Sequence, residues 1–273
     1  MPNESHHNAE IIPALSFLGK MVTVTIDRPL GSAHPNYPTA IYPINYGYLE
    51  GVLAPDGEEL DVYVLGADTP LRTFTGQVIG VIHRENDIED KLVAAPVGSI
   101  YSQNEILEQV HFQEQYFIHT VDCLYRKSAG AIVYRRPAKD IVYLLLFQSE
   151  SQTWSFPKGH MEAFETEQET VNREIHEETG LALSLHPEFR EEIAYTISSG
   201  ARKTVALYLA AIPNSISPNE ELRIRPDEIE EYRFVGKGEA CALLKHPEYH
   251  TILTKAEQTI LQESCEPTGI PLY

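Results

Sequence analysis

The stretch TWSFPKGHMEAFETEQETVNREIHEETGL, residues 153–181, decides the fold of the second half of the chain. Thr166 followed by Glu169 forms a Thr-x-x-Glu capping box, which is typical of the start of a helix. Gly180 suits the position just after a helix, because glycine adopts the left-handed conformation that ends it. The stretch therefore predicts a helix from about 166 to 179.

Three glutamates share one face of this helix. Glu174, Glu177 and Glu178 fall at i, i+3 and i+4, where like charges destabilise a helix unless a cation compensates them. Arg173 is expected to sit off to the side of that face. Clustered carboxylates suit hard cations, above all Mg²⁺. A solvated acidic face has the same spacing, and the helix alone does not separate the two interpretations.

The residues around the helix resemble the Nudix box at nine fixed positions: Gly159, Glu165, Arg173, Glu174, Ile175, Glu177, Glu178, Gly180 and Leu181. The resemblance implies a loop–helix–loop on an α/β/α sandwich with a mixed sheet. It also implies that Mg²⁺, with Mn²⁺ as a substitute, is held by Glu174, Glu177, Glu178 and the Gly159 carbonyl. By the same resemblance, Glu165 and Arg173 form a structural ion pair.

The expected reaction is hydrolysis of a diphosphate linkage by a metal-activated water. Glu178 or Glu177 is the favoured base, although a glutamate of a later loop is the alternative. The candidates in that loop are Glu228, Glu230 and Glu231. Lys158 could donate to a substrate phosphate as a compact charge, or it could be an ordinary solvated lysine.

Residues 128–261 resemble the asymmetrical diadenosine tetraphosphate hydrolases within that family. The resemblance rests on SAGAIVYR, W-x-F-P-K-G-H-M-E, KTVALYLA and EEYRFVGKGEACALL. It implies that Lys158 and His160 flank the phosphate chain, that Lys203 contacts a phosphate and that Tyr195 stacks on an adenine. Tyr195 could equally be a core or rim tyrosine. Hydrolases of nucleoside triphosphates, capped RNA ends and inositol pyrophosphates share most of these features.

Two strand-rich blocks meet near residue 120, so we expect domains at 1–120 and 121–273. The first block has the short β-branched stretches MVTVTI, DVYVLG, GQVIGVI and KLVAAP, which predict a small β-barrel of OB-like type or a sandwich. The segment 104–117 shows helical spacing of Ile106, Leu107, Val110 and Phe117. In the second block, strand-like and helix-like stretches alternate: a hairpin over 128–148, a strand at TVALYLAAI, and one or two helices in the last forty residues. This alternation indicates an α/β class.

Residues 20–117 resemble the family I inorganic pyrophosphatases. The matching pieces are YPINYGYLEGVL (42–53), DGEELDVYVL (56–65), PLRTFTGQVIGVI (70–82), IEDKLVAAP (88–96) and VHFQEQY (110–116). The resemblance implies that Asp56, Glu58 and Asp61 correspond to metal-binding carboxylates, with Glu58 in place of an aspartate. The same DGEELD segment could be only a hairpin turn.

The departures from that family point to lost activity. Arg84 stands where a metal-binding aspartate is expected, and Phe117 stands where the family places a lysine after Tyr116. The stretch between PLGSAHPNY and YPINYGY also lacks the usual basic residues that grip pyrophosphate. We therefore expect a degenerate barrel that serves as a scaffold, a lid or a homo-oligomer surface. A bifunctional hydrolase is the alternative.

Composition limits the partners. The net charge of −19 repels a nucleic-acid backbone, and no apolar run reaches the length of a membrane span. The N-terminus lacks a secretory pattern, which favours the cytoplasm, and Cys123, Cys241 and Cys265 read as three reduced thiols. The leading hypothesis is an enzyme with a small nucleotide substrate. A nucleotide-sensing regulatory protein is the second hypothesis, and its usual mark, loss of the three glutamates, is not seen in this sequence.

Overall fold

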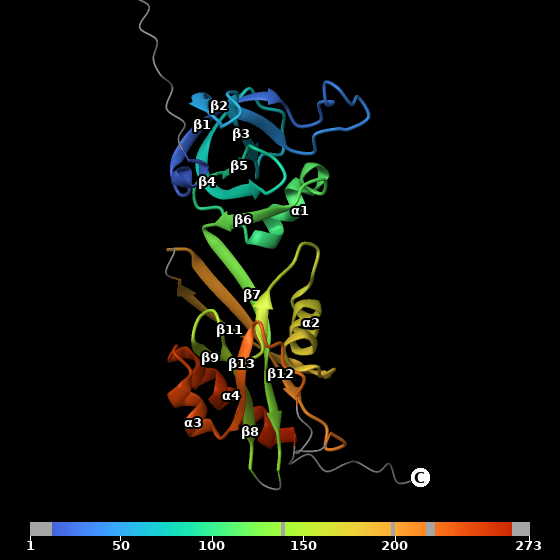
Figure 1. The fold of residues 1–273 in the computed structure, drawn as a ribbon, viewed down its shortest axis with the longest axis vertical. Helices are drawn as coiled ribbons and strands as arrows, with labels where there is room; N and C mark the ends of the chain where they lie inside the picture. Colours follow the sequence, from blue (N-terminus) through green and yellow to red (C-terminus); the bar gives the residue numbers. More distant parts are fainter. Residues whose placement is uncertain (1–12, 138–139, 198–199, 217–221, 264–273) are drawn as a thin grey trace, which may run out of the picture. The chain divides into compact units, whose positions relative to one another are not determined.

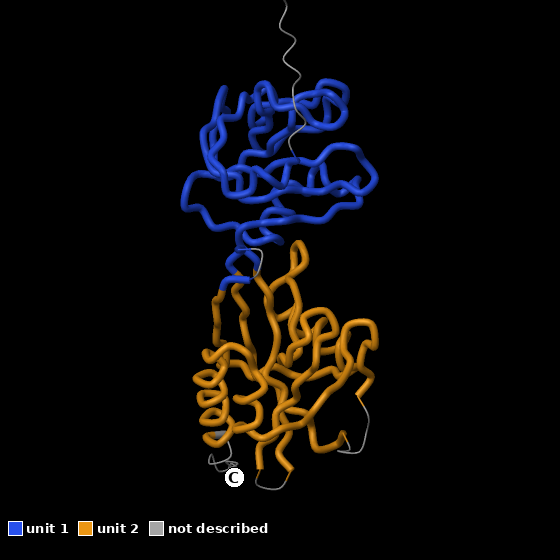
Figure 2. Tube along the Cα trace, turned by 60° about the vertical axis from the view of Figure 1, so that its left-hand side comes forward, with its two compact units in different colours: residues 1–126, 196–202 blue, residues 127–195, 203–273 orange. Residues whose placement is uncertain are grey.

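A computed structural model describes residues 13–137, 140–197, 200–216 and 222–263. The chain divides into two compact units, residues 1–126 with 196–202 and residues 127–195 with 203–273 (Figure 2). Cys123 and Cys241 are free thiols, while Cys265 lies outside the described residues. No helix of the described part is long and apolar enough to cross a membrane.

The first unit is built on a six-stranded sheet in the order β1-β2-β3-β5-β4-β6. An additional pairing of β1 with β4 closes five of the strands into a barrel, which confirms the predicted architecture. The elements are η1 (Ala14–Phe17), β1 (Met21–Arg28), β2 (Asn45–Leu53), β3 (Glu59–Val64), β4 (Thr73–Arg84), β5 (Lys91–Ala95), α1 (Gln103–Glu114) and β6 (His119–Cys123).

Alternating side chains of the barrel strands build two cores. In β3, Val62 and Val64 join the cluster that packs with η1, whereas Tyr63 and Leu65, the residue after the strand, join the cluster that packs with α1. This period of two is the geometry of a strand whose two faces are both covered. The barrel is therefore fixed by apolar burial on both faces of its strands.

Helix α1 confirms the helix expected over 104–117 except at its end. It starts after the Ser102 capping box and stops at Glu114, and the Phe117 N–H donates to the Glu114 carbonyl in a tighter closing turn. Phe117 thus lies beyond the helix. Its ring packs instead against the guanidinium of Arg84, whose central carbon is 3.7 Å from the ring centroid.

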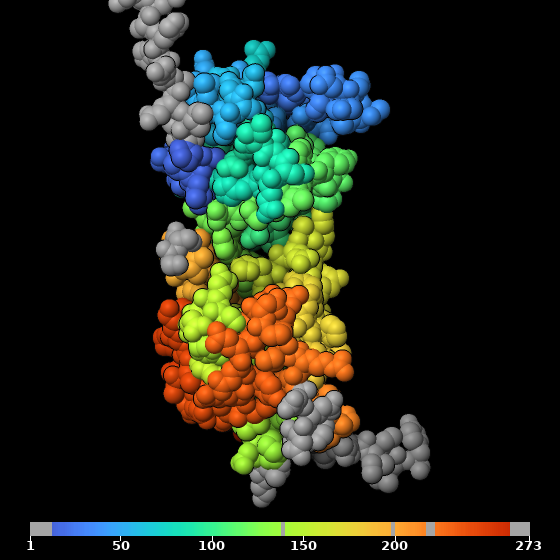
Figure 3. All heavy atoms as spheres, in the orientation of Figure 1, coloured from blue at the N-terminus to red at the C-terminus, as the bar shows by residue number. Residues whose placement is uncertain are grey.

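The second unit is a seven-stranded sheet with the path β11-β12-β7-β8-β13, to which β10 adds on β7 and β9 on β8. On the face shown in Figure 3, the yellow-green segment that contains β8 and β9 borders the orange segment that contains β13. The elements are β7 (Tyr125–Arg135), β8 (Val142–Gln148), β9 (Thr153–Ser155), β10 (Lys158–His160), α2 (Glu167–Thr179), β11 (Leu185–Thr196), β12 (Arg202–Ala211), β13 (Ile229–Val235), α3 (Lys237–Leu243) and α4 (Glu248–Glu263).

Helices cover both faces of this sheet (Figure 1). Ile132 of β7 packs with the residues of α3 and α4, while its neighbour Val133 packs with Val171 and Ile175 of α2. The same alternation runs along β8 and β12. The predicted α/β/α sandwich is therefore confirmed, and α2 is held on one face of the sheet by its apolar side.

Candidate functional site

Helix α2 begins and ends where its sequence predicts. The Thr166 hydroxyl accepts a hydrogen bond from the Glu169 N–H at 3.3 Å, and the Glu169 carboxylate accepts from the Thr166 N–H at 2.8 Å. Gly180 ends the helix with φ 73°. These local contacts fix which residues the helix presents on its polar side.

A bidentate ion pair ties the preceding loop to α2. The Arg173 guanidinium donates to both oxygens of Glu165, at 2.7 and 2.9 Å. The Glu165 carboxylate also accepts from the Thr170 hydroxyl at 2.7 Å. The hydrogen bonds from Arg173 are the largest cause that lowers the pKa of Glu165 to about 2. This pair joins the two segments of the box, as its resemblance implied.

The compensating cations differ from the expectation. Arg173 does not sit off to the side, because its guanidinium also donates to Glu174 at 2.7 Å and lies 3.6 Å from Glu177. Arg225, which follows β12 in a loop, reaches Glu177 at 3.5 Å. The long side chain of Arg173 reaches from Glu165 to Glu174 and Glu177, so one arginine both pairs with Glu165 and compensates the acidic face.

Glu174 lies directly against Gly159. A Cβ built at Gly159 would be 1.9 to 2.3 Å from the atoms of the Glu174 carboxyl group, so only glycine leaves room for it. Burial raises the pKa of Glu174, while the neighbouring Arg173 opposes that rise. The Glu174 carboxylate is thereby brought against β10 at Gly159.

Glu178 is the most buried carboxylate of the three, with 3% of its surface exposed. Its two oxygens accept hydrogen bonds from the Gln148 amide at 3.1 Å and from the Lys158 backbone N–H at 3.0 Å. Burial raises the pKa of Glu178 to about 7, against the opposing effect of the Gln148 hydrogen bond. The carboxylate is held in place by the ends of β8 and β10.

These groups line one cleft of about 570 Å³ that combines acidic and basic side chains. Such a lining can hold cations and phosphates together. The lining residues are Gln148, Glu150, Ser151, Lys158, Gly159, His160, Glu162, Arg173, Glu174, Glu177, Glu178, Lys203, Arg225, Asp227 and Glu228.

Most of the expected substrate residues lie in this cleft, and one does not. Lys158, His160 and Lys203 line it. Burial lowers the pKa of Lys158. Tyr195 is not among the lining residues, and its ring is stacked on that of His246 with centroids 3.9 Å apart. Tyr195 therefore lies outside the lining of the cleft and stacks on a ring of the chain itself.

The three later glutamates are also separated by the fold. Glu228 lines the cleft and pairs with Arg225 at 2.8 Å. Glu230 accepts from the Gln152 amide at 2.7 Å, and Glu231 pairs with Arg233 at 2.7 Å; neither is a lining residue. Among these three, only Glu228 has access to a substrate in the cleft.

The donor chemistry of the cleft fits a divalent cation. Four oxygen donors of the box lie in one cleft, and the Gly159 position is shaped to let the Glu174 carboxylate approach. Within the described ranges, no three acidic, histidine or cysteine side chains already converge as a preformed ion site. The reason is visible in the contacts, since the carboxylates of Glu174 and Glu178 are turned towards protein donors.

The candidate carboxylates of the barrel are not gathered. Asp56 accepts from the Glu58 N–H at 3.0 Å within the turn between β2 and β3, where both residues are exposed. Asp61 lies on β3 and pairs with Lys91 at 2.5 Å, and Lys91 also pairs with Glu89. A lysine of the chain thus compensates the carboxylate that would otherwise be open to a metal.

Two cleft residues that contact the box glutamates were not predicted from the sequence, Gln148 and Arg225. Gln148 is the polar last residue of the otherwise largely apolar strand β8, and this was the one signal in the sequence that could have marked it as a site residue. Arg225 precedes the three candidate glutamates in RIRPDEIEE, and no local pattern assigns it a role. Their roles depend on contacts between distant segments.

Comparison with known proteins agrees with the division of the chain into two compact units. A family model described as NUDIX domain matches residues 124–255, and one described as Inorganic pyrophosphatase matches residues 18–126. The asymmetrical bis(5′-nucleosyl)-tetraphosphatase of Mus musculus is 34% identical over 142 residues, which cover 48% of this chain and 93% of that protein. An inorganic pyrophosphatase of Bacillus sp. (strain PS3) is 29% identical over 131 residues, covering 37% of this chain and 79% of that protein.

Among solved structures, a C. elegans Ap4A hydrolase binary complex has 26% sequence identity and a TM-score of 0.46, covering 50% of this chain and 98% of that one. The mouse relative matches across nearly its whole length, and box residues including Gly159, Glu174, Glu177 and Glu178 line the cleft. The chain therefore belongs to the Nudix family, as a hydrolase of pyrophosphate bonds related to the asymmetrical tetraphosphatases, with an inorganic-pyrophosphatase-like domain before it.

Proposed function

We propose that the chain hydrolyses a dinucleoside polyphosphate such as diadenosine tetraphosphate in a reaction that requires Mg²⁺. The observation that carries the proposal is the cleft in which Glu174, Glu177 and Glu178 face the basic residues Lys158 and Lys203. Similarity to the mouse tetraphosphatase supports the substrate class. A polyphosphate needs both kinds of group, because its own charges repel a nucleophile.

Each side chain of the cleft has a proposed part. Glu174, Glu177, Glu178 and the Gly159 carbonyl would hold the metal, which when bound neutralises phosphate charge and lowers the pKa of water. Lys158, His160 and Lys203 would bind phosphate oxygens and fix the orientation of the chain of phosphates. Glu178 or Glu177 would accept the proton of the attacking water, with Glu228 as the alternative base in the cleft.

The test combines a substrate panel with three matched variants. Purified protein is incubated with Mg²⁺ and dinucleoside polyphosphates, nucleoside triphosphates or inorganic pyrophosphate, and the products are identified in ¹⁸O water. We expect dinucleoside polyphosphates to be preferred. Glu178→Gln should lower kcat by about 100- to 10,000-fold, the usual contribution of a general base, without unfolding the chain.

Glu228→Gln separates the two base assignments, and Glu230→Gln is the matched control because its side chain lies outside the cleft. If only Glu228→Gln abolishes turnover, the later loop supplies the base. Full activity of Glu178→Gln would remove the helix from the mechanism. Saturable nucleotide binding without turnover of any substrate would instead favour the sensing protein.

A further inference from the structure

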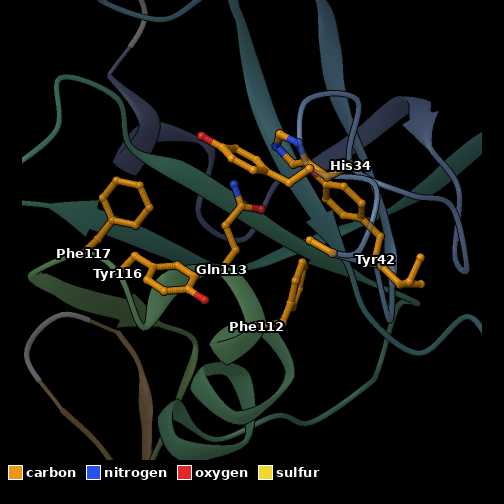
Figure 4. Close-up of a pocket in the computed structure, with 9 residues that line it drawn as sticks. His34, Tyr42, Phe112, Gln113, Tyr116 and Phe117 are labelled. Atoms are coloured by element: carbon orange, nitrogen blue, oxygen red, sulfur yellow. The ribbon is translucent and has the colours of Figure 1, made fainter.

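The first unit contains a cavity that the Nudix reaction does not use. It has a volume of about 590 Å³, within the usual range of small-molecule sites. It opens between the segment that precedes β2 and the end of α1 (Figure 4). Its lining residues are His34, Tyr37, Ala40, Ile41, Tyr42, Phe112, Gln113, Tyr116 and Phe117.

Two aromatic walls face this cavity, and contacts behind them fix one ring in each (Figure 4). In the first wall, His34 and Tyr42 lie nearly parallel, 6° apart, and Phe112 packs edge-on against Tyr42 with centroids 5.6 Å apart. In the second wall, the Phe117 ring packs on the guanidinium of Arg84. The walls are therefore formed before any ligand arrives.

Arg84 is itself held rigidly. Its guanidinium donates to both oxygens of the buried Glu114, at 2.6 and 2.9 Å, and to Asp87 at 2.9 Å. A cation fixed in this way holds the ring stacked on it. Phe117 and Arg84, two of the departures from the pyrophosphatase pattern, thus act together to build one wall of the cavity.

A single amide projects between the walls. Figure 4 shows the Gln113 side chain directed into the space that His34, Tyr116 and Phe117 surround. Its Oε1 atom is shielded from solvent and has no hydrogen-bond partner in the part of the chain that the structure describes. His34 Nδ1 accepts from the Asn36 N–H at 3.1 Å, so Nε2 carries the ring proton and can donate.

Among the residues that the structure describes, no lysine, arginine, aspartate or glutamate lines the cavity. A phosphate or pyrophosphate would leave water there without a compensating charge, which is costly. A planar, uncharged ring would lose little on entry and would gain stacking contacts. An amide between aromatic walls matches the adenine edge in particular, because it can pair with N6 and N7 at the same time.

We propose that this cavity binds the adenine base of a nucleoside or nucleotide. The ring lies between the two walls with its N6 and N7 edge towards Gln113, and the sugar points to the mouth. Tyr116, which is 75% exposed, and Tyr37, which is 67% exposed, stand where a base would enter. The site is separate from the catalytic cleft, so it does not depend on the function proposed above.

The test titrates the full chain with adenosine and with purine riboside, which lacks the N6 amino group, by calorimetry. Neither ligand has a phosphate, so neither is hydrolysed. We expect adenosine to bind more tightly. Tyr116→Ala should weaken both ligands alike, by about 5- to 150-fold, as removal of one stacking ring does. Gln113→Leu should erase the preference for adenosine while it retains the binding of purine riboside.

Val97→Ala is the matched control, because Val97 is 68% exposed on the first unit and lines neither this cavity nor the catalytic cleft, so its truncation should leave adenosine binding unchanged. The proposal is overturned if Tyr116→Ala and Gln113→Leu bind adenosine as the unaltered chain does. It is also overturned if adenosine does not bind; sedimentation would then test whether Tyr116→Ala converts a dimer into a monomer. That result would make the exposed rings an interface between two copies.

Discussion

Gly159 shows how much one missing side chain can decide. Its backbone faces the Glu174 carboxyl group so closely that a Cβ would meet the carboxyl atoms at 1.9 to 2.3 Å. The obstacle is the tip of a flexible side chain rather than backbone. An alanine there would therefore displace the carboxylate and leave the strand intact.

We predict that Gly159→Ala lowers activity by about 10- to 100-fold, the usual effect of disturbing a metal ligand's surroundings, and raises the Mg²⁺ concentration needed for half-maximal rate. The melting temperature should change little. Gly238→Ala is the control, because nothing lies within 4 Å of a Cβ at that position. The role given to Gly159 would be wrong if both variants kept full activity at low Mg²⁺.

At the scale of single residues, the sequence could name the acidic groups but not their partners. Glu174, Glu177 and Glu178 follow from the box, since their spacing is local. The reach of Arg225 to Glu177 spans 48 positions, and the Gln148 contact with Glu178 spans 30. No periodic pattern encodes contacts of that kind, because they form only when the sheet brings the loops together.

Helix α2 is anchored at its first residue by three strands. The Glu167 carboxylate accepts from Arg190 of β11 at 2.6 and 2.7 Å and from Tyr208 of β12 at 2.9 Å, and it pairs with Lys127 of β7 at 2.9 Å. A carboxylate in the first turn also interacts favourably with the helix dipole. The position of the glutamate face thus depends on this junction.

The Arg190 hydrogen bonds are the largest cause that lowers the pKa of Glu167 from 4.5 to about 2. Its contribution to stability is therefore full above pH 4.5 and is lost as the pH falls towards 2. We predict that Glu167→Gln lowers the free energy of unfolding by about 1.5–3 kcal/mol at pH 7. Urea unfolding at pH 7 and pH 2.5 measures it, and the gap from the unaltered chain should shrink at the lower pH.

Glu188→Gln is the control for this prediction, since Glu188 is exposed on β11 and the substitution should change the stability little at either pH. An equal loss of stability for Glu167→Gln at pH 7 and pH 2.5 would mean that packing, rather than the charge, connects α2 to the strands.

Elements were predictable where their signals are local. The caps of α2 lie within three residues of the helix ends, and the runs of β-branched residues in β1, β3, β4 and β5 predict strands directly. The three-residue strands β9 and β10 carry no such pattern, because their pairing with β8 and β7 alone makes them strands. Likewise Phe117 continues the helical spacing in the sequence, yet α1 ends at Glu114 and the Phe117 ring packs on Arg84.

At the scale of the whole molecule, two units with pyrophosphate-related ancestry carry different charges at their sites. The Nudix cleft leaves carboxylates and lysines together in one cavity. In the barrel, cations of the chain already pair with acidic side chains: Lys91 pairs with Asp61 and Glu89, and Arg84 pairs with Glu114. Charged side chains that already pair with one another inside the chain are not available to bind a metal ion or a phosphate substrate.

We therefore predict that the barrel does not hydrolyse inorganic pyrophosphate. The full chain with Glu178→Gln, which silences the Nudix cleft, is incubated with Mg²⁺ and pyrophosphate, and phosphate release is measured beside that of the unaltered chain. Release by the unaltered chain alone would belong to the Nudix cleft. Enzyme-like release by Glu178→Gln would show that the barrel is still a pyrophosphatase, despite the arginine and lysine that compensate its carboxylates.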